Sequence, residues 1–217
     1  DESRPVLTGV RLHTADGALY MAATDSYRLA EKNLGAHKTN VDLLIPATAM
    51  QDLLRILGDI ENEVQVTHDE QQVRFQVGDV ELVARLLEGS YPDYRKLIPK
   101  SFSVSATVKR ADFVNVTKVS ALFARESAGS VTIEVDEKKS TLSIRSIASQ
   151  LGENTATANG TISGSGSITL NSRYLLDALQ VLASDDLAFS FNGKLEPTLL
   201  KDVGTDDYNH IIMPLKS

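Results

Sequence analysis

The sequence contains no cysteine among its 217 residues. This absence excludes a disulfide framework, a zinc site built on thiolates and a cysteine nucleophile. It suits a reducing cytosol, so we expect a cytoplasmic protein. Hydrophobic residues make up 42% of the chain, which is enough for buried cores and argues against a disordered protein.

Long hydrophobic runs and targeting signals are also missing. No apolar run approaches the ~20 residues that are needed to cross a bilayer. The N-terminal DESRPVLTG has neither the charged region nor the apolar region of a signal peptide. It begins inside what looks like an ordered segment, so we expect the chain to be a fragment.

Motifs that carry catalysis are scarce. None of the four histidines (His13, His37, His68 and His210) has the spacing of a metal ligand with another. There is no GxSxG elbow and no GxxxxGK[ST] phosphate loop, and the SGSGS segment 163–167 is typical of a turn. The net charge of −7 does not favour a nucleic-acid binder, although it could hide a local basic face.

Most of the chain has the alternating pattern of short β-strands. VLTGVRLHT and ALYMAAT predict two strands joined by a turn at residues 15–17. Residues 64–87 predict three strands, with turns at Asp69-Glu70 and Gly78-Asp79. Residues 130–148, 155–170 and 187–203 predict further strands, the last with Asn192-Gly193 as a hairpin turn.

Three segments predict helices instead, at residues 47–57, 109–125 and 172–182. The first and last have leucines at helical spacing, and Asn171 or Ser172 is available as an N-cap. The middle segment is richer in β-branched residues, which favour helices less.

The two halves of the chain resemble each other. Residues 45–57 superpose on residues 170–182 at an offset of 125, which matches Asp52 with Asp177 and Leu54 with Leu179. A repeat unit above 100 residues is far longer than a solenoid repeat. We therefore expect two homologous α+β domains, at residues 1–100 and 101–217. The helix at 109–125 has no counterpart in the first half, so we expect the first domain to lack its opening strand and helix.

Two segments leave their roles open. ATDSYRLA, residues 23–30, is either a polar turn or a functional cluster, because Thr, Asp and Ser side chains readily bond to nearby backbone groups. HIIMPLKS, residues 210–217, either forms a buried final strand or lines a groove, since Met adapts to varied partners.

These segments also carry a family resemblance. ATDSYRLA, SYPDYRKLIPK (residues 90–100) and IIMPL (residues 211–215), in this order on duplicated domains, resemble the bacterial sliding clamp, the β subunit of DNA polymerase III. RPVLTGV (residues 4–10) is similar to that family's entry into the same domain. The resemblance implies the DNA-clamp fold, with antiparallel sheets outside and helices lining the inner face. The chain would hold the second domain, clipped at its start, and the complete third domain.

In that family the ATD-x-x-RLA turn forms a wall of a pocket that receives a linear peptide from partner proteins. The resemblance implies that three groups of residues build this pocket: Leu7, Thr24, Ser26, Tyr27, Arg28 and Leu29 as the wall; Pro92, Lys96 and Leu97 as the floor between the domains; and Leu195, Pro197, Ile211, Ile212, Met213, Pro214 and Leu215 from the third domain.

The resemblance also implies a homodimeric ring that holds duplex DNA by its phosphates, without reading the bases. The cations expected to face the DNA are Lys109, Arg110, Lys118 and Arg125, with Arg4, Arg55 and Arg173 as weaker candidates. Leu122 and Phe123 would meet the next protomer. Each of these residues could instead be an ordinary surface or core residue.

The leading interpretation is a processivity factor that is not an enzyme. Its partners would be double-stranded DNA, the replicative polymerase, the clamp loader and other proteins with a clamp-binding motif. It would need no cofactor, because the clamp loader uses the ATP. The alternatives are a small hydrolase or transferase built on Asp25, Ser26, Tyr27 and Arg28, and a β-rich adhesion module. The first lacks an evident base, and the second lacks cysteine and a signal peptide.

Overall fold

The computed structural model describes residues 4–58, 63–148 and 152–216. Ser217, the last residue of the apolar tail, lies outside this part of the chain. The fold divides into two compact units. The first unit runs up to Asp25 and from Glu31 to Asp93, and the second comprises Ser26–Ala30 and the chain from Tyr94 onward. Each unit combines antiparallel sheets with helices, as the α+β expectation required.

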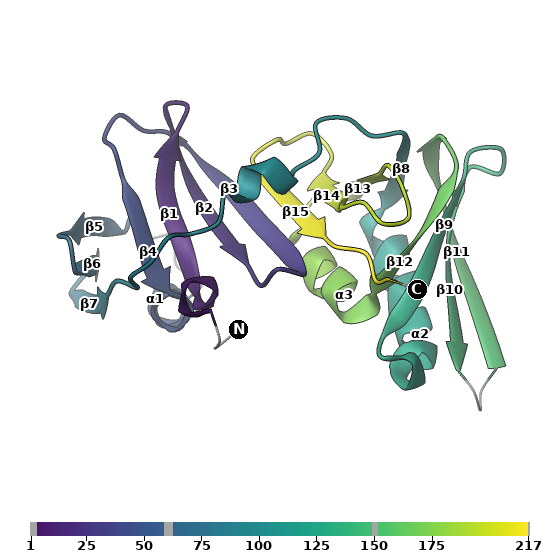
Figure 1. Cartoon of the computed structure of the whole chain (residues 1–217), viewed down its shortest axis with the longest axis horizontal. Helices are drawn as coiled ribbons and strands as arrows, with labels where there is room; N and C mark the ends of the chain where they lie inside the picture. Colours follow the sequence, from purple (N-terminus) through teal and green to yellow (C-terminus); the bar gives the residue numbers. More distant parts are fainter. Residues whose placement is uncertain (1–3, 59–62, 149–151, 217) are drawn as a thin grey trace. The chain divides into compact units, whose positions relative to one another are not determined.

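Among its described residues, the first unit contains two small sheets, one α-helix and a short 3-10 helix (Figure 1). Its four-stranded sheet has the order β4-β1-β2-β3 and its three-stranded sheet the order β5-β6-β7. The elements are β1 (Gly9–Ala15), β2 (Ala18–Thr24), β3 (Arg28–Ala36, whose first residues belong to the second unit), β4 (Asp42–Pro46), α1 (Ala47–Leu57), β5 (Gln65–His68), β6 (Gln72–Val77) and β7 (Val80–Arg85).

The start of the first unit differs from the sequence expectation. VLTGVRLHT is not one strand, because Pro5–Thr8 form a short 3-10 helix and β1 begins only at Gly9. Pro5 suits the first helical position, where its missing N–H costs nothing. The Thr8 hydroxyl donates to the Pro5 carbonyl at 2.7 Å, which closes the turn.

The second unit is larger and has eight strands in the order β12-β9-β10-β11-β8-β13-β14-β15 among the described residues. Helices α2 and α3 lie side by side against these strands (Figure 1). A 3-10 turn, Tyr94–Leu97, opens the unit, and a second one, Ala124–Ser127, follows α2. The elements are β8 (Val104–Lys109), α2 (Arg110–Phe123), β9 (Ser130–Asp136), β10 (Thr141–Ala148), β11 (Gly152–Ser163), β12 (Gly166–Asn171), α3 (Ser172–Val181), β13 (Asp186–Phe191), β14 (Thr198–Asp202) and β15 (Tyr208–Ile212).

Two turns of the second unit lie where their sequence signals predict them. The SGSGS segment is a turn, in which Gly164 has φ of +76° and a Cβ there would meet the Ser103 backbone. Asn192-Gly193 lies in the hairpin that joins β13 to β14, as expected, but the connection spans residues 192–197, because β13 ends at Phe191 and β14 begins at Thr198. The Asn192 side chain accepts a hydrogen bond from the Ser103 backbone N–H at 2.7 Å.

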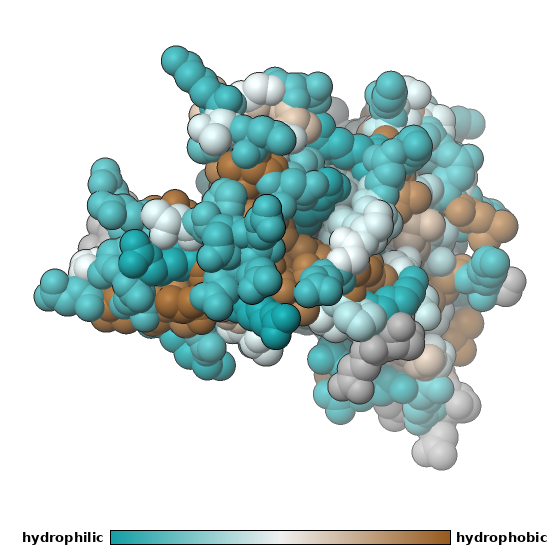
Figure 2. All heavy atoms as spheres, turned by 60° about the vertical axis from the view of Figure 1, so that its left-hand side comes forward, coloured by the Kyte–Doolittle hydropathy of each residue, from teal (hydrophilic) through white to brown (hydrophobic). Residues whose placement is uncertain are grey.

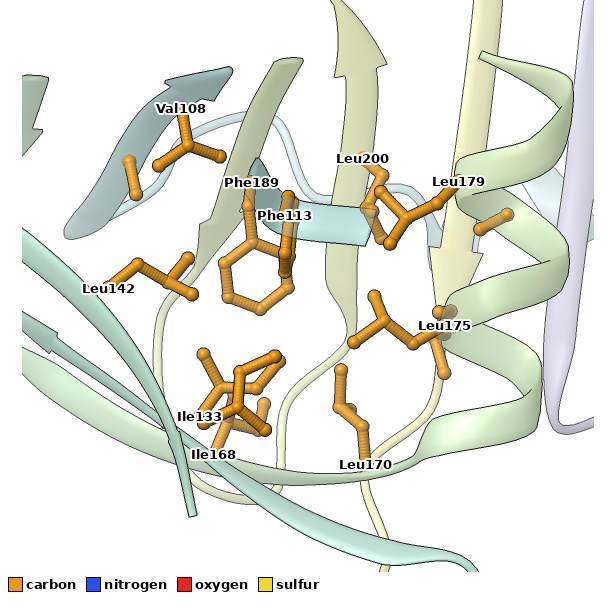
Figure 3. Packing of buried hydrophobic residues seen from close by; sticks show 14 of the residues in the cluster. Val108, Phe113, Ile133, Leu142, Ile168, Leu170, Leu175, Leu179, Phe189 and Leu200 are labelled. Carbon is orange, nitrogen blue, oxygen red and sulfur yellow. The ribbon is translucent and has the colours of Figure 1, made fainter. Parts of the chain in front are cut away.

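The core of the second unit fixes the position of α2 and α3. Phe113 of α2 and Phe189 of β13 are fully buried and meet edge to face, with ring centroids 5.8 Å apart (Figure 3). Leu175 and Leu179 of α3 point into the same cluster (Figure 3). This packing holds the outward face of α3 in place, and that face carries the residues discussed below.

The surface of the molecule is not uniformly polar. Hydrophobic side chains emerge between hydrophilic ones on the face drawn in Figure 2. The exposed hydrophobic residues of the first unit include Leu34, Leu54, Val66 and Val80. Within the described residues, no helix is long and apolar enough to span a membrane.

Candidate functional site

The ATDSYRLA segment turns sharply between β2, which ends at Thr24, and β3, which begins at Arg28. Ser26 has φ of 74°, a left-handed conformation that residues other than glycine adopt at a cost. Ser26 and Tyr27 are exposed, Arg28 is half-buried and Leu29 is buried. The turn therefore presents the side chains of Ser26 and Tyr27 to solvent, while the buried side chain of Leu29 anchors it.

Helix α3 holds two side chains of this turn. The guanidinium Nη1 of Arg28 lies 2.6 Å from Oδ2 of Asp177, and its Cζ lies 4.5 Å from the ring centroid of Tyr174. The rings of Tyr27 and Tyr174 stack with their centroids 6.4 Å apart. Arg28 thus combines an ion pair with a cation–π contact, and all four side chains belong to the second unit.

Sequence reasoning missed Tyr174 and Asp177 as parts of this cluster. Their spacing of three residues places them on one face of a helix, which was available as a signal. Asn171 caps that helix by accepting a hydrogen bond from the Arg173 backbone N–H at 2.9 Å. Nothing in the local pattern, however, indicates that Arg28 reaches a helix 149 residues further along the chain.

The C-terminal segment begins as the buried final strand that was one of its two expected roles. Ile211 and Ile212 are buried in β15, as a final strand requires. Met213, Pro214 and Leu215 follow the strand and stay partly exposed. The Met213 backbone N–H donates to the Tyr27 carbonyl at 2.8 Å, and that of Leu215 donates to the Thr169 carbonyl at 2.8 Å. The tail is therefore tied both to the turn and to the strand that precedes α3.

The other residues expected in the peptide pocket lie at several places. Leu195 is 65% exposed and Pro197 half-buried in the connection between β13 and β14. Lys96 and Leu97 are exposed in the 3-10 turn that opens the second unit. The expected residues in the first unit are Leu7 and Thr24, which are half-buried, and Pro92, which is exposed. That all of these residues share one pocket stays a prediction.

Helix α2 brings together residues that were expected to have two different roles. Lys118, Leu122 and Arg125 follow one another at spacings of four and three residues, which places them on one side of the helix and the turn that extends it. They line an open hollow of about 420 Å³ with Val119, Ala121 and Leu176. Leu122 is 55% exposed, whereas Phe123 is partly buried.

The remaining expected DNA-facing cations differ in their surroundings. Lys109 pairs with Asp186 at 2.9 Å, and this carboxylate raises the pKa of the Lys109 ammonium above its usual value. Arg55 pairs with Asp52 of the same helix at 2.7 Å. Arg110 is half-buried, while Arg4 and Arg173 are exposed. In the part of the chain that the structure describes, no three histidine or acidic side chains gather as metal ligands do.

Two family models match this chain along almost its whole length. Residues 1–93 match the central domain of the DNA polymerase III beta subunit, and residues 95–216 match the C-terminal domain of that subunit. The chain therefore belongs to the DNA polymerase III beta subunit family.

Individual relatives agree with this assignment. The beta sliding clamp of Staphylococcus aureus is 32% identical over 220 residues, and that of Staphylococcus epidermidis is 31% identical. Each alignment covers 100% of this chain but 58% of the relative, so the chain spans little more than half the length of these proteins.

Solved structures show the same fold. The DNA polymerase sliding clamp of Bacillus subtilis superposes with a TM-score of 0.93 at 29% identity, covering 100% of this chain and 58% of the other. The DNA polymerase III beta subunit of Thermotoga maritima superposes with a TM-score of 0.91 at 23% identity, covering 100% and 59%. The two units thus have the clamp fold that the resemblance implied.

Proposed function

We propose that this chain is part of a sliding clamp, a processivity factor that encircles duplex DNA and tethers the replicative polymerase. Family membership supports the proposal, because relatives that match the whole chain are named beta sliding clamps. Such a protein acts by topology: release from DNA requires opening of a ring rather than loss of a few contacts. Its place of action would be the cytoplasm, where bacterial DNA lies.

The observation that carries the proposal is the way the tail joins the turn. The Met213 N–H bonds to the Tyr27 carbonyl at 2.8 Å, which brings two of the three family motifs into one small region of the second unit. Met213 and Leu215 supply apolar surface there, and Tyr27 and Arg28 supply an aromatic and a polar group. An apolar slot with a few polar groups at its rim suits the Leu and Phe side chains of a linear peptide.

We assign the full set of peptide-contacting residues from the family motifs. The wall is Leu7, Thr24, Ser26, Tyr27, Arg28 and Leu29, the floor is Pro92, Lys96 and Leu97, and the third domain adds Leu195, Pro197 and the segment 211–215. Since Leu29, Ile211 and Ile212 are buried, their part would be to support the exposed residues beside them.

The basic and apolar side of α2 supports the rest of the proposal. Lys118 and Arg125 are exposed and would meet DNA phosphates, with Arg4, Arg110 and Arg173 as further contacts. Lys109 would contribute less to DNA binding, because its positive charge is partly offset by the ion pair with Asp186. Leu122 and Phe123 would meet a second protomer, Leu122 at the hollow beside Leu176, as a homodimeric ring requires.

We propose no catalytic role for the cluster Asp25-Ser26-Tyr27-Arg28. Arg28 forms an ion pair with Asp177 of α3, and Tyr27 stacks on Tyr174 of the same helix. These contacts stabilise the conformation of the turn. The clamp needs no cofactor of its own, since the clamp loader supplies the energy for ring opening.

A single substitution tests the peptide site. Met213→Ala removes an apolar side chain but keeps the backbone N–H that bonds to Tyr27, so the local fold is preserved. We expect affinity for a Gln-x-x-Leu-Phe-type peptide to fall by about 1–3 kcal/mol, measured by isothermal titration calorimetry. Val203→Ala, at the far end of the β14–β15 hairpin, is the matched control and should not change affinity. Unchanged affinity in Met213→Ala would remove that residue from the site.

A further inference from the structure

The first unit contains a hollow that the proposed function does not use. Its volume is about 260 Å³, and it lies where the segment after β7 passes beside β4 (Figure 1). The Leu87 backbone N–H donates to the Leu44 carbonyl at 2.8 Å, which fixes this segment against the edge of β4. Charged and apolar side chains share the lining, which includes Arg11, Asp42, Leu44, Glu70, Leu87 and Tyr91.

The charge that the hollow presents to solvent is negative. Asp42 holds Arg11 by two hydrogen bonds, from Nε at 2.8 Å and from Nη2 at 2.9 Å. The Asp42 side chain is 59% exposed and that of Arg11 only 24%, so the carboxylate is the more accessible member of the pair. Glu70, an exposed residue of the turn between β5 and β6, adds a second carboxylate. One guanidinium and two carboxylates leave the lining with a net negative charge.

Apolar groups form the rest of the wall. Leu44 is buried, and Leu87 beside it is half-buried. The ring centroid of Tyr91 lies 5.9 Å from Cζ of Arg11, and the Tyr91 hydroxyl donates to the Ala22 carbonyl at 3.4 Å, which fixes the ring. Such a wall suits the methylene groups of a long side chain whose charged end reaches the carboxylates.

The second unit builds the same place without these charges. Thr169 aligns with Leu44 at the offset of 125, and its carbonyl likewise accepts a hydrogen bond, from the Leu215 N–H at 2.8 Å. Thr132 faces Thr169 across β9 and β12, as Arg11 faces Leu44 across β1 and β4. The two threonine hydroxyls bond to each other at 3.0 Å. The clamp domain therefore does not need an ion pair here to hold its edge strand, which leaves the charges of the first unit available to a ligand.

We propose that this hollow binds a basic side chain of a partner protein, with its ammonium or guanidinium group at Asp42 and Glu70 and its methylene groups against Leu87 and Tyr91. Both carboxylates attract an incoming cation, and partial enclosure reduces the screening of that attraction by water. An acidic side chain would instead meet the exposed Asp42 carboxylate before the recessed Arg11. The lining residues all belong to the first unit, so a partner would gain a contact beyond those assigned to the peptide site.

The experiment follows the backbone amide signals of the isotope-labelled chain by NMR during titration with three short peptides. These are acetyl-Gly-Lys-Gly-amide and the same peptide with norleucine or glutamate in place of lysine. Norleucine keeps the methylene groups of lysine and lacks its charge. We expect the lysine peptide to shift the Leu44, Leu87 and Tyr91 signals and to bind, in the millimolar range, about threefold more tightly than the other two. Raising the salt to about 0.5 M should reduce this preference, because exposed charges are screened.

Three variants make the result specific. Glu70→Gln removes one carboxylate from a surface turn and should weaken binding of the lysine peptide about threefold, with no change for the norleucine peptide. Asp42→Asn should act in the same direction, although it also loosens Arg11. Glu134→Gln is the matched control, because Glu134 is an exposed carboxylate on β9 of the second unit, and it should leave all affinities unchanged. Thermal unfolding verifies that each variant is folded.

The outcomes are distinguishable. Saturable binding that prefers lysine and weakens in Glu70→Gln, with no change in Glu134→Gln, supports the inference. Equal binding of the lysine and norleucine peptides, preference for the glutamate peptide, or no binding overturns it. Putrescine, a free diamine, is titrated in parallel: if it displaces the lysine peptide and binds more tightly, the hollow takes a small amine and the assignment to a partner protein is wrong. None of these results depends on binding of a clamp-motif peptide, so the proposed function is tested separately.

Discussion

Asp42 shows how a single residue ties two strands of the first unit together. Its carboxylate accepts two hydrogen bonds from Arg11, from Nε at 2.8 Å and from Nη2 at 2.9 Å. The two residues are diagonal neighbours across β1 and β4, where opposite charges stabilise a sheet. The Arg11 guanidinium holds the pKa of the Asp42 carboxyl below its ordinary value.

This lowered pKa predicts a pH-dependent contribution to stability. Because the pKa is lower in the folded state, the stabilisation is present above the ordinary pKa of 3.8 and is lost as the pH falls through the folded value. We expect Asp42→Asn to lower the free energy of unfolding by about 0.5–1 kcal/mol at pH 7 and by less at pH 2.5, below the ordinary pKa. Urea denaturation of both chains at the two pH values measures this. The same difference at both values would contradict it.

The residues of the candidate site were only partly predictable from sequence. Tyr27, Arg28 and Met213 belong to contiguous motifs, so a family pattern could mark them. Tyr174 and Asp177 lie more than a hundred residues after Tyr27 and Arg28, and a strand and a hairpin separate them from Met213. Their role depends on tertiary contacts. Local patterns report capping, turns and amphipathic faces, but they do not report which turn a helix will touch.

At the scale of elements, the three helices were well predicted and the ends of strands less so. The structure has helices at Ala47–Leu57, Arg110–Phe123 and Ser172–Val181, close to the expected segments. In the first and last of these helices the leucine spacing is a strong, redundant signal. The error at Pro5 arose where one residue's backbone preference replaced the simple strand pattern. The hairpin at Asn192-Gly193 is present, but its connection is longer than two residues.

Because the two units are duplicates, equivalent residues and elements in them can be compared directly. Leu179 is completely buried in α3, whereas the aligned Leu54 in α1 is 66% exposed. In the second unit α2 packs against α3, and β8 pairs with both β11 and β13. In the first unit the strands in the corresponding places, β3 and β5, belong to different sheets.

The domain limits of 1–100 and 101–217 remain a proposal. The two compact units meet in sequence at Asp93 and Tyr94.

The same comparison predicts unequal costs for equal substitutions. Leu179→Ala should lower the free energy of unfolding of this chain by about 2–5 kcal/mol, because it leaves a cavity in a packed core. Leu54→Ala should cost less than about 0.5 kcal/mol, since its side chain is mostly in solvent. Guanidinium denaturation followed by circular dichroism measures both. Similar costs for the two variants would show that Leu54 is covered in solution.

At the scale of the whole molecule, sequence and structure agree on a tandem pair of clamp domains. The net charge of −7 argued against a nucleic-acid binder, but Lys118 and Arg125 gather beside Leu122 on one side of α2. A ring needs only its inner surface to be basic, so an acidic total is compatible with the proposed grip on DNA. Composition could not reveal this, because it sums over surfaces that face different partners.

We propose that this chain captures a linear peptide beside Tyr27 and Met213, and a single titration decides whether it does. A fluorescently labelled Gln-x-x-Leu-Phe-type peptide is titrated with the folded chain, and its anisotropy is followed. The matched control peptide has alanine in place of both Leu and Phe. We expect micromolar binding of the first peptide and no binding of the second. Equal binding of both peptides, or binding of neither by a folded sample, would contradict it.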